Sequence, residues 1–392
     1  GKFPQQAESE NTIRQQTSTS MPIVRCMDLQ KMAGDEVEFD FVNHLGGKPI
    51  MGSRNAEGYG KAMSFAQDRL RINQARYPIS AGDTMTQQRT PHQLRSLART
   101  LGEAYMNRLQ DQLSLVHMAG ARGFHNNVEW AVPLASDPDF ASILVNPVRA
   151  PSRNRHFMST GTGLETVKAA ASEITMTTAD VFNADLVDSL RAQLDSMALA
   201  PSPIEFDGDT LAADSPLRVL LVSSDQFASF AQSTNYRTYL SNAIARGQQA
   251  GNHPLFMGGD TALWNGILMV KMPKPIRFYA GNPINWCAST TSETETTTDL
   301  APAALGTGYA IDRAILLGGQ ALAEAWGKHR KTGNPFFWSE KELDHDDKLE
   351  LLVGAINGRS KVRFEVDHGN EKQITDNGII AIDTVVKLGV AA

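Results

Sequence analysis

The clearest pattern of hydrophobic and polar positions lies between Thr90 and Arg122. Thr90 is followed directly by a proline and three residues later by a glutamine, a combination that signals the start of a helix. Gly120 and Gly123 are placed to end it. Between these limits apolar residues recur at steps of three and four: Leu94, Leu97, Leu101, Tyr105, Leu109, Leu113 and Val116. The pattern predicts a helix over residues 91–121, about 45 Å long at 1.5 Å per residue.

A helix of this length with one apolar stripe is typical of a spine that packs against something flat. We therefore expect Leu101 and Leu109 to be buried. The candidate partner is C-terminal, where Lys361–Val366 and Ile379–Asp383 alternate like strands on either side of a polar turn region at His368–Asn377. Two strands are too few to be stable alone, so we expect them to pair with each other and to pack on the helix.

The segment before the helix has little apolar content at its start. Residues 1–20 are rich in Gln, Ser, Thr and Glu and predict a mobile arm. Val37–Phe41 alternates like a half-buried strand. Residues 46–83 are punctuated by glycine and predict a long two-stranded excursion that builds little core of its own. Two interpretations of this excursion stay open: a flexible surface loop, or an arm that reaches a neighbouring molecule.

The chain after the helix predicts a mixed α/β unit. Residues 124–177 have no clear period, and a second helix is expected from Thr177 to near Ala198. From Pro216 onward the patterns predict the following elements: a strand at Arg218–Val222, helices at Gln226–Gln232 and Tyr236–Arg246, a loop at Gly247–Leu263, strands at Gly266–Lys271 and Ile276–Tyr279, an exposed loop at Ser289–Asp299, and a strand at Ala314–Leu317 that turns through Gly318 and Gly319 into a helix ending at Trp326.

Composition narrows the class of protein. The 392 residues are enough for two or three domains with large cores. A net charge of −6 lacks the basic excess expected of a dedicated nucleic-acid binder. No apolar run is long enough to cross a membrane, and the first residues lack the apolar segment of a signal peptide. Cys26 and Cys287 are too few for a disulfide framework and predict reduced thiols.

Signals of enzymatic chemistry are weak. Gly161–Gly163 and Gly306–Gly308 lack the third glycine of a dinucleotide-binding loop. Asp344–Asp347 contains metal-binding residue types, but a solvated helix start with capping acids explains it better. Trp264, Trp286, Trp326 and Trp338 are interpreted as core or interface anchors. No acid–base or nucleophile constellation is recognisable, so we predict no catalytic, cofactor-binding or metal-binding residue and no cofactor.

The order of these parts, together with four local motifs, carries a resemblance to a known family. The motifs are Gly82–Thr90, Asn252–Gly259, Ala314–Leu322 and Ser360–Phe364. The chain resembles the Hong Kong 97 fold of tailed-bacteriophage capsid proteins, and more closely the major capsid protein family of lytic podoviruses related to coliphage N-four. The likeness covers nearly the whole chain and is weakest over residues 1–20 and 124–177.

The resemblance implies an α+β fold with the division that this family has. It implies an N-terminal arm at 1–45, an extended loop at 46–83, a peripheral domain with the spine helix at 84–215, an axial domain at 216–345, and return strands of the peripheral domain at 346–392. It implies a structural virion protein that self-assembles into hexamers and pentamers of an icosahedral shell around double-stranded DNA. The shell would form in the cytoplasm of the bacterial host.

The resemblance also implies partners. These are other copies of the chain, the portal and scaffolding proteins, a decoration protein where one exists, and packaged DNA by non-specific proximity, with no membrane. Hydrophobic residues such as Trp130 and Phe140 are candidates for contacts between subunits. Two alternatives remain: an encapsulin-like cellular compartment shell of the same fold, which would enclose a protein cargo, and a soluble enzyme with an unfamiliar site.

Overall fold

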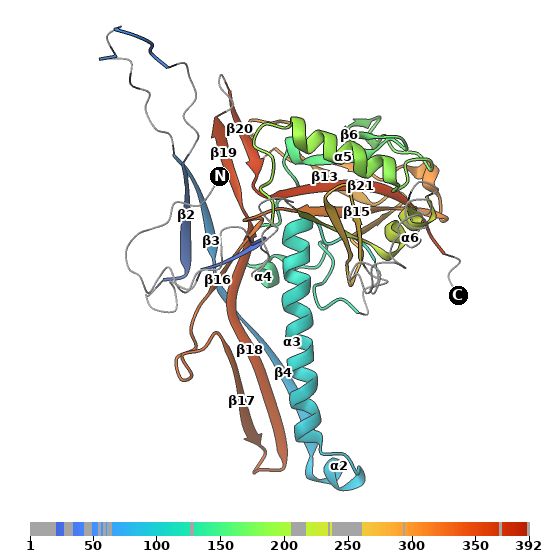
Figure 1. The fold of residues 1–392 in the computed structure, drawn as a ribbon. Coiled ribbons are helices and arrows are strands. Elements are labelled where there is room, and N and C mark those ends of the chain that lie inside the picture. The colour runs from blue at the N-terminus through green and yellow to red at the C-terminus, as the bar shows by residue number, and fades with distance from the viewer. Residues whose placement is uncertain are drawn as a thin grey trace, which may run out of the picture.

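The structure is a computed structural model of the chain, and it describes residues 21–26, 34–42, 49–53, 56–57, 60, 65–125, 129–204, 217–233, 236, 261–292, 295–367 and 371–389. It is mixed α/β and elongated (Figure 1). A long helix runs from a large sheet at one end to a narrow extremity at the other. The predicted arm at residues 1–20, most of the predicted loop at Gly247–Leu263 and nearly all of the predicted helix at Tyr236–Arg246 lie outside the described residues.

The narrow half consists of one helix against one sheet. Helix α3 (Leu94–Ala119) packs along strand β18 (Lys348–Lys361), which is flanked by β4 (Asn73–Asp83) and β17 (Phe336–Leu343). Strand β16 (Leu322–Trp326) continues the sheet beyond β17 and pairs in parallel with β1 (Ile23–Cys26). The short helix α2 (Thr84–Arg89) closes the extremity (Figure 1).

The wide half is built on an eight-stranded sheet. Its strand order is β10-β11-β9-β15-β21-β5-β6, with β12 paired to β15. The bounds are β5 His156–Ser159, β6 Leu164–Thr166, β9 Arg218–Val222, β10 Thr261–Trp264, β11 Ile267–Lys271, β12 Arg277–Tyr279, β15 Tyr309–Leu317 and β21 Ile379–Lys387. Helices α5 (Ala184–Ser196) and α6 (Ser224–Gln232) cover one face, while the end of α3 packs toward the other. Two cores therefore share this sheet.

The remaining strands form small sheets around these two halves. Strands β2 (Glu36–Val42) and β3 (Phe65–Arg71) pair as an antiparallel ribbon, as do β19 (Arg363–Asp367) and β20 (Lys372–Asp376). A four-stranded sheet has the order β13-β14-β8-β7. Its bounds are β7 Ala169–Ala170, β8 Glu173–Ile174, β13 Pro283–Trp286 and β14 Thr297–Leu300. Helix α4 (Phe140–Leu144) and the 3-10 turns Arg153–Arg155 (η2) and Ala303–Leu305 (η4) connect these parts.

The long helix begins later than the sequence predicts. Thr90 has extended backbone angles and terminates α2 instead of capping α3, whose N-cap is Gln93 without a side-chain cap. The side chain of Gln87 takes over that role and accepts a hydrogen bond from the Leu94 N–H at 3.1 Å. The end is as predicted, since Gly120 adopts a left-handed conformation with φ of 67° and caps the helix.

The predicted burial is confirmed for Leu109 and wrong for Leu101 in the single chain. Leu109 is 6% exposed, whereas Leu101 is 57% exposed. The sheet contacts the side of the helix that carries Gly102, Met106 and Leu109. At about 100° per residue, Leu101 lies roughly a quarter-turn away from Gly102. The apolar residues therefore occupy two adjacent faces, and the sheet covers only one.

Several predicted elements are confirmed and others are wrong. The strands near Val37–Phe41, Arg218–Val222, Gly266–Lys271 and Ile276–Tyr279 and the helix before Gln232 are present. The helix expected from Thr177 begins at Ala184, with Asn183 as its N-cap. The helix expected before Trp326 is instead strand β16, because β1 and β18 pair with both of its edges. The predicted exposed loop at Ser289–Asp299 is wrong at its end, because strand β14 begins at Thr297.

The C-terminal strands do not pair as predicted. Strand β19 pairs with β20, whereas β21 lies between β15 and β5 in the large sheet. The strand that covers α3 is β18, which begins earlier in the chain. Asp344–Asp347 is the turn between β17 and β18 and not a helix start, and three of its residues have positive φ: Asp344, His345 and Asp346.

Candidate assembly interface

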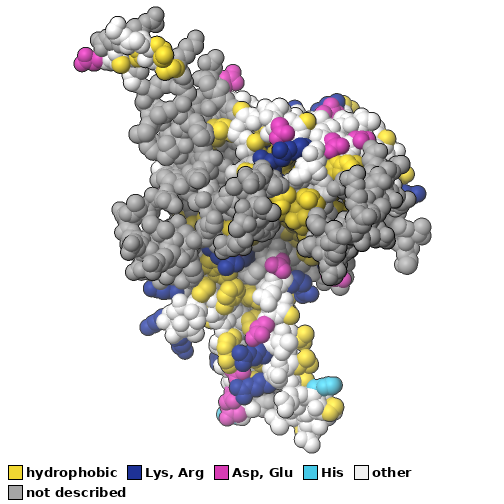
Figure 2. All heavy atoms as spheres, viewed as in Figure 1, with side chains coloured by type: hydrophobic (Ala, Val, Ile, Leu, Met, Phe, Trp, Pro, Cys, Tyr) yellow, Lys and Arg dark blue, Asp and Glu magenta, His cyan; other side chains and the backbone are white. Residues whose placement is uncertain are grey.

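Exposed apolar side chains gather on the narrow half of the molecule. Among the described residues, six of the nine large hydrophobic side chains that stay exposed lie on α2, α3, β4 and β17: Tyr77, Met85, Leu97, Leu101, Phe336 and Trp338. We call these six residues the tip surface. Figure 2 shows apolar side chains on this half, interspersed with basic and acidic side chains. Exposed large apolar side chains gathered on one part of a molecule are typical of a protein–protein contact.

Two flanks of α3 carry the tip surface. On the β4 side, the rings of Tyr77 and Tyr105 stack with centroids 3.9 Å apart, beside the exposed Leu101. On the β17 side, the Arg99 guanidinium lies 4.6 Å above the Trp338 ring. These contacts hold the aromatic rings in place while leaving part of each ring open to solvent.

Helix α3, which carries part of the tip surface, packs closely against the sheet beneath it. A Cβ atom on Gly102 of α3 would lie 2.7 Å from the Ile79 Cδ1 atom and 3.1 Å from Val353 Cγ1. A polar contact adds to this packing near the start of α3, where Arg95 Nε donates to Glu340 Oε1 at 3.0 Å. The exposed pair contributes little to stability but fixes the orientation of β17 against α3.

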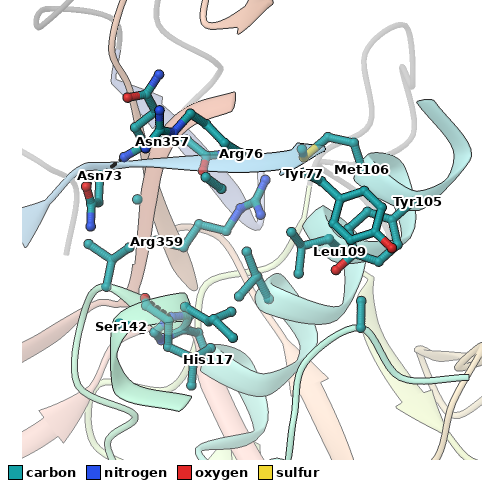
Figure 3. Close-up of a pocket in the computed structure, with 18 residues that line it drawn as sticks. Asn73, Arg76, Tyr77, Tyr105, Met106, Leu109, His117, Ser142, Asn357 and Arg359 are labelled. Carbon is teal, nitrogen blue, oxygen red and sulfur yellow. Dashed lines mark hydrogen bonds between the residues drawn. The ribbon is translucent and has the colours of Figure 1, made fainter. Parts of the chain in front are cut away.

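A cavity of about 360 Å³ separates β4 from α3 and α4 further along the helix (Figure 3). Tyr77, Tyr105 and Leu109 form its apolar side, and Arg359 and Asn357 of β18 its polar side. His117 lines the inner end, where its Nε2 lies 3.2 Å from the Leu144 carbonyl oxygen. Burial lowers the pKa of His117 to about 4, so the ring is neutral near pH 7.

Buried ionic clusters connect several elements, and the first joins the long helix to the large sheet. Arg313 of β15 donates to both carboxylate oxygens of Asp383 at 2.7 and 2.9 Å, and His156 Nε2 lies 2.8 Å from the same carboxylate. Although burial opposes it, the charge of Arg313 holds the pKa of Asp383 well below its usual range. Arg313 also donates to the carbonyl of Ala119, so this cluster anchors the end of α3 to the large sheet.

The second cluster lies where β18 leads into β19. Arg363 Nε donates to Asp376 Oδ1 at 2.6 Å, and Lys361 Nζ lies 2.9 Å from Asp376 Oδ2. Burial lowers the pKa of Lys361 to about 8, although Asp376 opposes the shift. Such pairs are costly to desolvate and add little net stability, but removing one partner leaves a buried charge unmatched.

The candidate residues of the sequence interpretation do not converge on one place. Gly161–Gly163 and Gly306–Gly308 lie in separate turns, and the described part of the chain contains no group of three or more metal-ligating side chains. Trp130 is buried under the Arg122 guanidinium at 3.9 Å, so in this chain it is a core residue and not an open contact. Trp286 and Trp326 are also buried, whereas Trp338 is 48% exposed.

Cys26 and Cys287 are both buried and are not joined to each other by a disulfide. Within the described ranges, no helix combines the length and the apolar character that crossing a membrane requires.

Comparison with known proteins decides the family. The profile of a family described as "Phage capsid protein" matches residues 3–388. The chain belongs to the phage capsid protein family. A search of curated proteins finds no match.

Solved phage capsids have the same fold. The capsid of Ralstonia phage GP4 superposes with a TM-score of 0.69 at 23% identity, covering 96% of this chain and 90% of the other. The cyanophage Pam1 capsid asymmetric unit gives 0.65 at 15% identity, with 95% and 90% covered. The acid-stable capsid of Helicobacter pylori bacteriophage KHP30 gives 0.60 at 11% identity, with 95% and 89% covered.

The family indicates what kind of partner the tip surface is expected to contact. A phage capsid protein is a structural component of the virion and not an enzyme, and it builds a shell from copies of itself. The alternative of a cellular compartment shell is not favoured by these relatives. The stiff narrow half and its uncovered apolar residues are therefore candidates for contacts between subunits.

Proposed function

We propose that this capsid protein has the Hong Kong 97-type fold and forms hexamers and pentamers of an icosahedral shell around the double-stranded DNA of a tailed phage. The observation that carries the proposal is the tip surface, where Leu97 and Leu101 are 47% and 57% exposed on a helix whose other side packs against the sheet. Because each side chain is only about half exposed, covering it against a neighbour contributes roughly half of the ~1.5–3 kcal/mol that full burial of a leucine gives.

The proposed division of the chain has four parts. Residues 1–45 form the arm, 46–83 the extended loop, and 216–345 most of the axial domain. Residues 84–215 and 346–392 contribute to the peripheral domain. Strand pairing supports amendments to this division, because β4, β16 and β17 belong with β18 in the sheet beside α3, and β21 belongs with the large sheet. The portal, scaffolding and any decoration protein remain proposed partners. We expect assembly in the host cytoplasm, with DNA contained by proximity only.

The experiment replaces Leu101 by glutamate and follows shell formation by sedimentation and negative-stain electron microscopy. We expect a folded subunit with unchanged thermal unfolding, because Leu101 contacts solvent in the single chain, and at least a tenfold loss of shells. The control is Ala192→Glu, which introduces the same negative charge at an exposed position of helix α5. Normal shells from Leu101→Glu would refute the assignment of the tip surface as a subunit contact.

A further inference from the structure

The base of the β2/β3 ribbon is fixed to the body of the subunit by a set of buried contacts. Along β3, Ala66, Asp68 and Leu70 are buried while Gln67 and Arg69 are exposed, so one face of the strand lies against the body. The Leu70 side chain has no exposed surface and joins a cluster with Val362 and Phe364. The ribbon is therefore attached to the body at its base, and β3 pairs with β2 instead of with a second strand of the predicted excursion.

Asp68 makes the first polar attachment. Arg149 donates to both of its carboxylate oxygens, at 3.1 and 2.8 Å. The backbone N–H of Arg363, at the start of β19, donates to Asp68 Oδ2 at 3.1 Å. A bidentate arginine fixes the orientation of a carboxylate as well as its position. The strand is thus held from two segments that are distant in sequence.

Asn146 makes the second attachment, at the corner where β3 leads into β4. Its Oδ1 accepts from the Arg71 N–H at 2.9 Å, and its Nδ2 donates to the Arg71 carbonyl at 2.9 Å. The same Nδ2 donates to the Arg359 carbonyl of β18 at 3.0 Å. One buried amide therefore satisfies both backbone groups of the corner residue and ties it to the central strand of the sheet.

The corner is also closely packed and is supported by a strained residue. A Cβ atom on Gly358 of β18 would lie 1.8 Å from the Arg71 carbonyl oxygen, so the two backbones are in direct contact. Val145, which precedes Asn146, has φ of 65°, a conformation that a β-branched residue rarely adopts. Strain of this kind persists where the surroundings require one backbone position, and here it presents Asn146 to the corner.

We propose that Asn146, supported by the Asp68–Arg149 pair, is a positioning residue that fixes the direction in which the β2/β3 ribbon leaves the subunit. The inference rests on the proposed function in one respect, since the ribbon is expected to contact an adjacent subunit. A direction set within the subunit would present the ribbon to each neighbour at a defined angle before contact. Loss of the Asn146 hydrogen bonds would leave the subunit folded and the packing of Leu70 in place, but the corner at Arg71 would be less constrained and the ribbon would sample a wider range of directions.

The test measures the ribbon's direction in the full-length, unassembled chain. Spin labels are placed at Gln67→Cys on β3 and Asn107→Cys on α3, both exposed positions, and the distance between them is measured by pulsed electron resonance. The native cysteines are buried, so the introduced thiols take the labels. We expect one narrow distance distribution without further change, and a distribution at least twice as broad with Asn146→Leu, which keeps the branched shape of the side chain but removes all of its side-chain hydrogen bonds.

The control and a second variant keep the test decisive. Asn357→Leu removes another buried asparagine, which donates to Gln110 of α3 and not to the ribbon, and it should leave the distribution narrow. If Asn146→Leu fails to fold, Arg149→Gln gives the same readout at a partly exposed position. Folded Asn146→Leu and Arg149→Gln chains with distributions as narrow as the parent would overturn the inference. Because the distance is read without assembly, this result is independent of whether shells form.

Discussion

At the scale of single residues, close backbone contacts place the strictest limits on this chain. Gly358 lies against the Arg71 carbonyl oxygen, and neither backbone can move without disturbing the strands on either side. Gly308 provides a contrast in the same chain, because a Cβ atom added there would meet no other atom within 4 Å. The difference between these two glycines is geometric and not conformational, because neither needs a left-handed backbone.

Gly358→Ala should destabilise the subunit by about 3 kcal/mol, because overpacking against a backbone atom cannot be relieved by a rotamer change. Gly308→Ala should change stability by less than about 0.5 kcal/mol. Chemical denaturation of the two variants beside the parent chain measures both. Equal stabilities for the two variants would contradict the contact between β18 and Arg71.

His117 makes the stability of the folded subunit depend on pH in the acidic range. Its pKa is about 4 in the folded chain and near 6.5 when unfolded, because burial disfavours the charged ring. Between these values the unfolded chain binds more protons, so stability falls as the pH drops from 6.5 toward 4. His117→Gln should flatten that part of the stability profile, as measured by thermal unfolding at a series of pH values. If the profile of stability against pH were unchanged, groups other than His117 would determine the pH dependence in this range.

At the scale of elements, α3 has two apolar faces with different roles. Leu109→Ala should cost about 2–5 kcal/mol in the unassembled subunit, because it leaves a cavity against β18. Leu101→Ala should cost less than about 0.5 kcal/mol there, since the side chain is largely solvated. Denaturation of the two variants distinguishes the faces, and a similar loss for both would mean that the sheet covers Leu101 as well.

Elements with strong local signals can be predicted from the sequence, and those that depend on distant partners cannot. Ser223 and Gln226 form the capping box that starts α6, a signal complete within four residues. Residues 322–326 contain good helix formers, yet pairing with β1 and β18 makes them a strand. The period of α3 is predictable, but which of its apolar faces meets the sheet depends on where β18 returns.

The candidate interface is predictable only in part. An excursion before the spine helix can be recognised from its glycines, but its attachment cannot. Asn146 lies 75 residues from Arg71 along the chain, and Arg149 lies 81 residues from Asp68. No local pattern connects such pairs. Residue type alone predicts Trp130 and Phe140 as contacts, and Trp130 is instead covered by Arg122.

At the scale of the whole molecule, the wide half contains most of the core and the narrow half presents the exposed apolar residues. The large sheet carries two cores, one on each face, and the buried Arg313–Asp383 pair joins it to the end of α3. The narrow half extends from this anchor (Figure 1) and exposes the tip surface on α2, α3, β4 and β17. A rigid subunit with apolar residues at an extremity is suited to contacts with several neighbours around a shell.

The most direct test of this account is a reconstruction by electron cryomicroscopy of particles from cells that express the chain with its phage scaffold. The account predicts closed icosahedral shells of hexamers and pentamers, in which each subunit buries several thousand Å² and neighbours cover Leu97 and Leu101, well above the roughly 1,600 Å² of a standard contact. Only monomers or dimers under every scaffold and salt condition, or shells in which both leucines stay solvated, would contradict it.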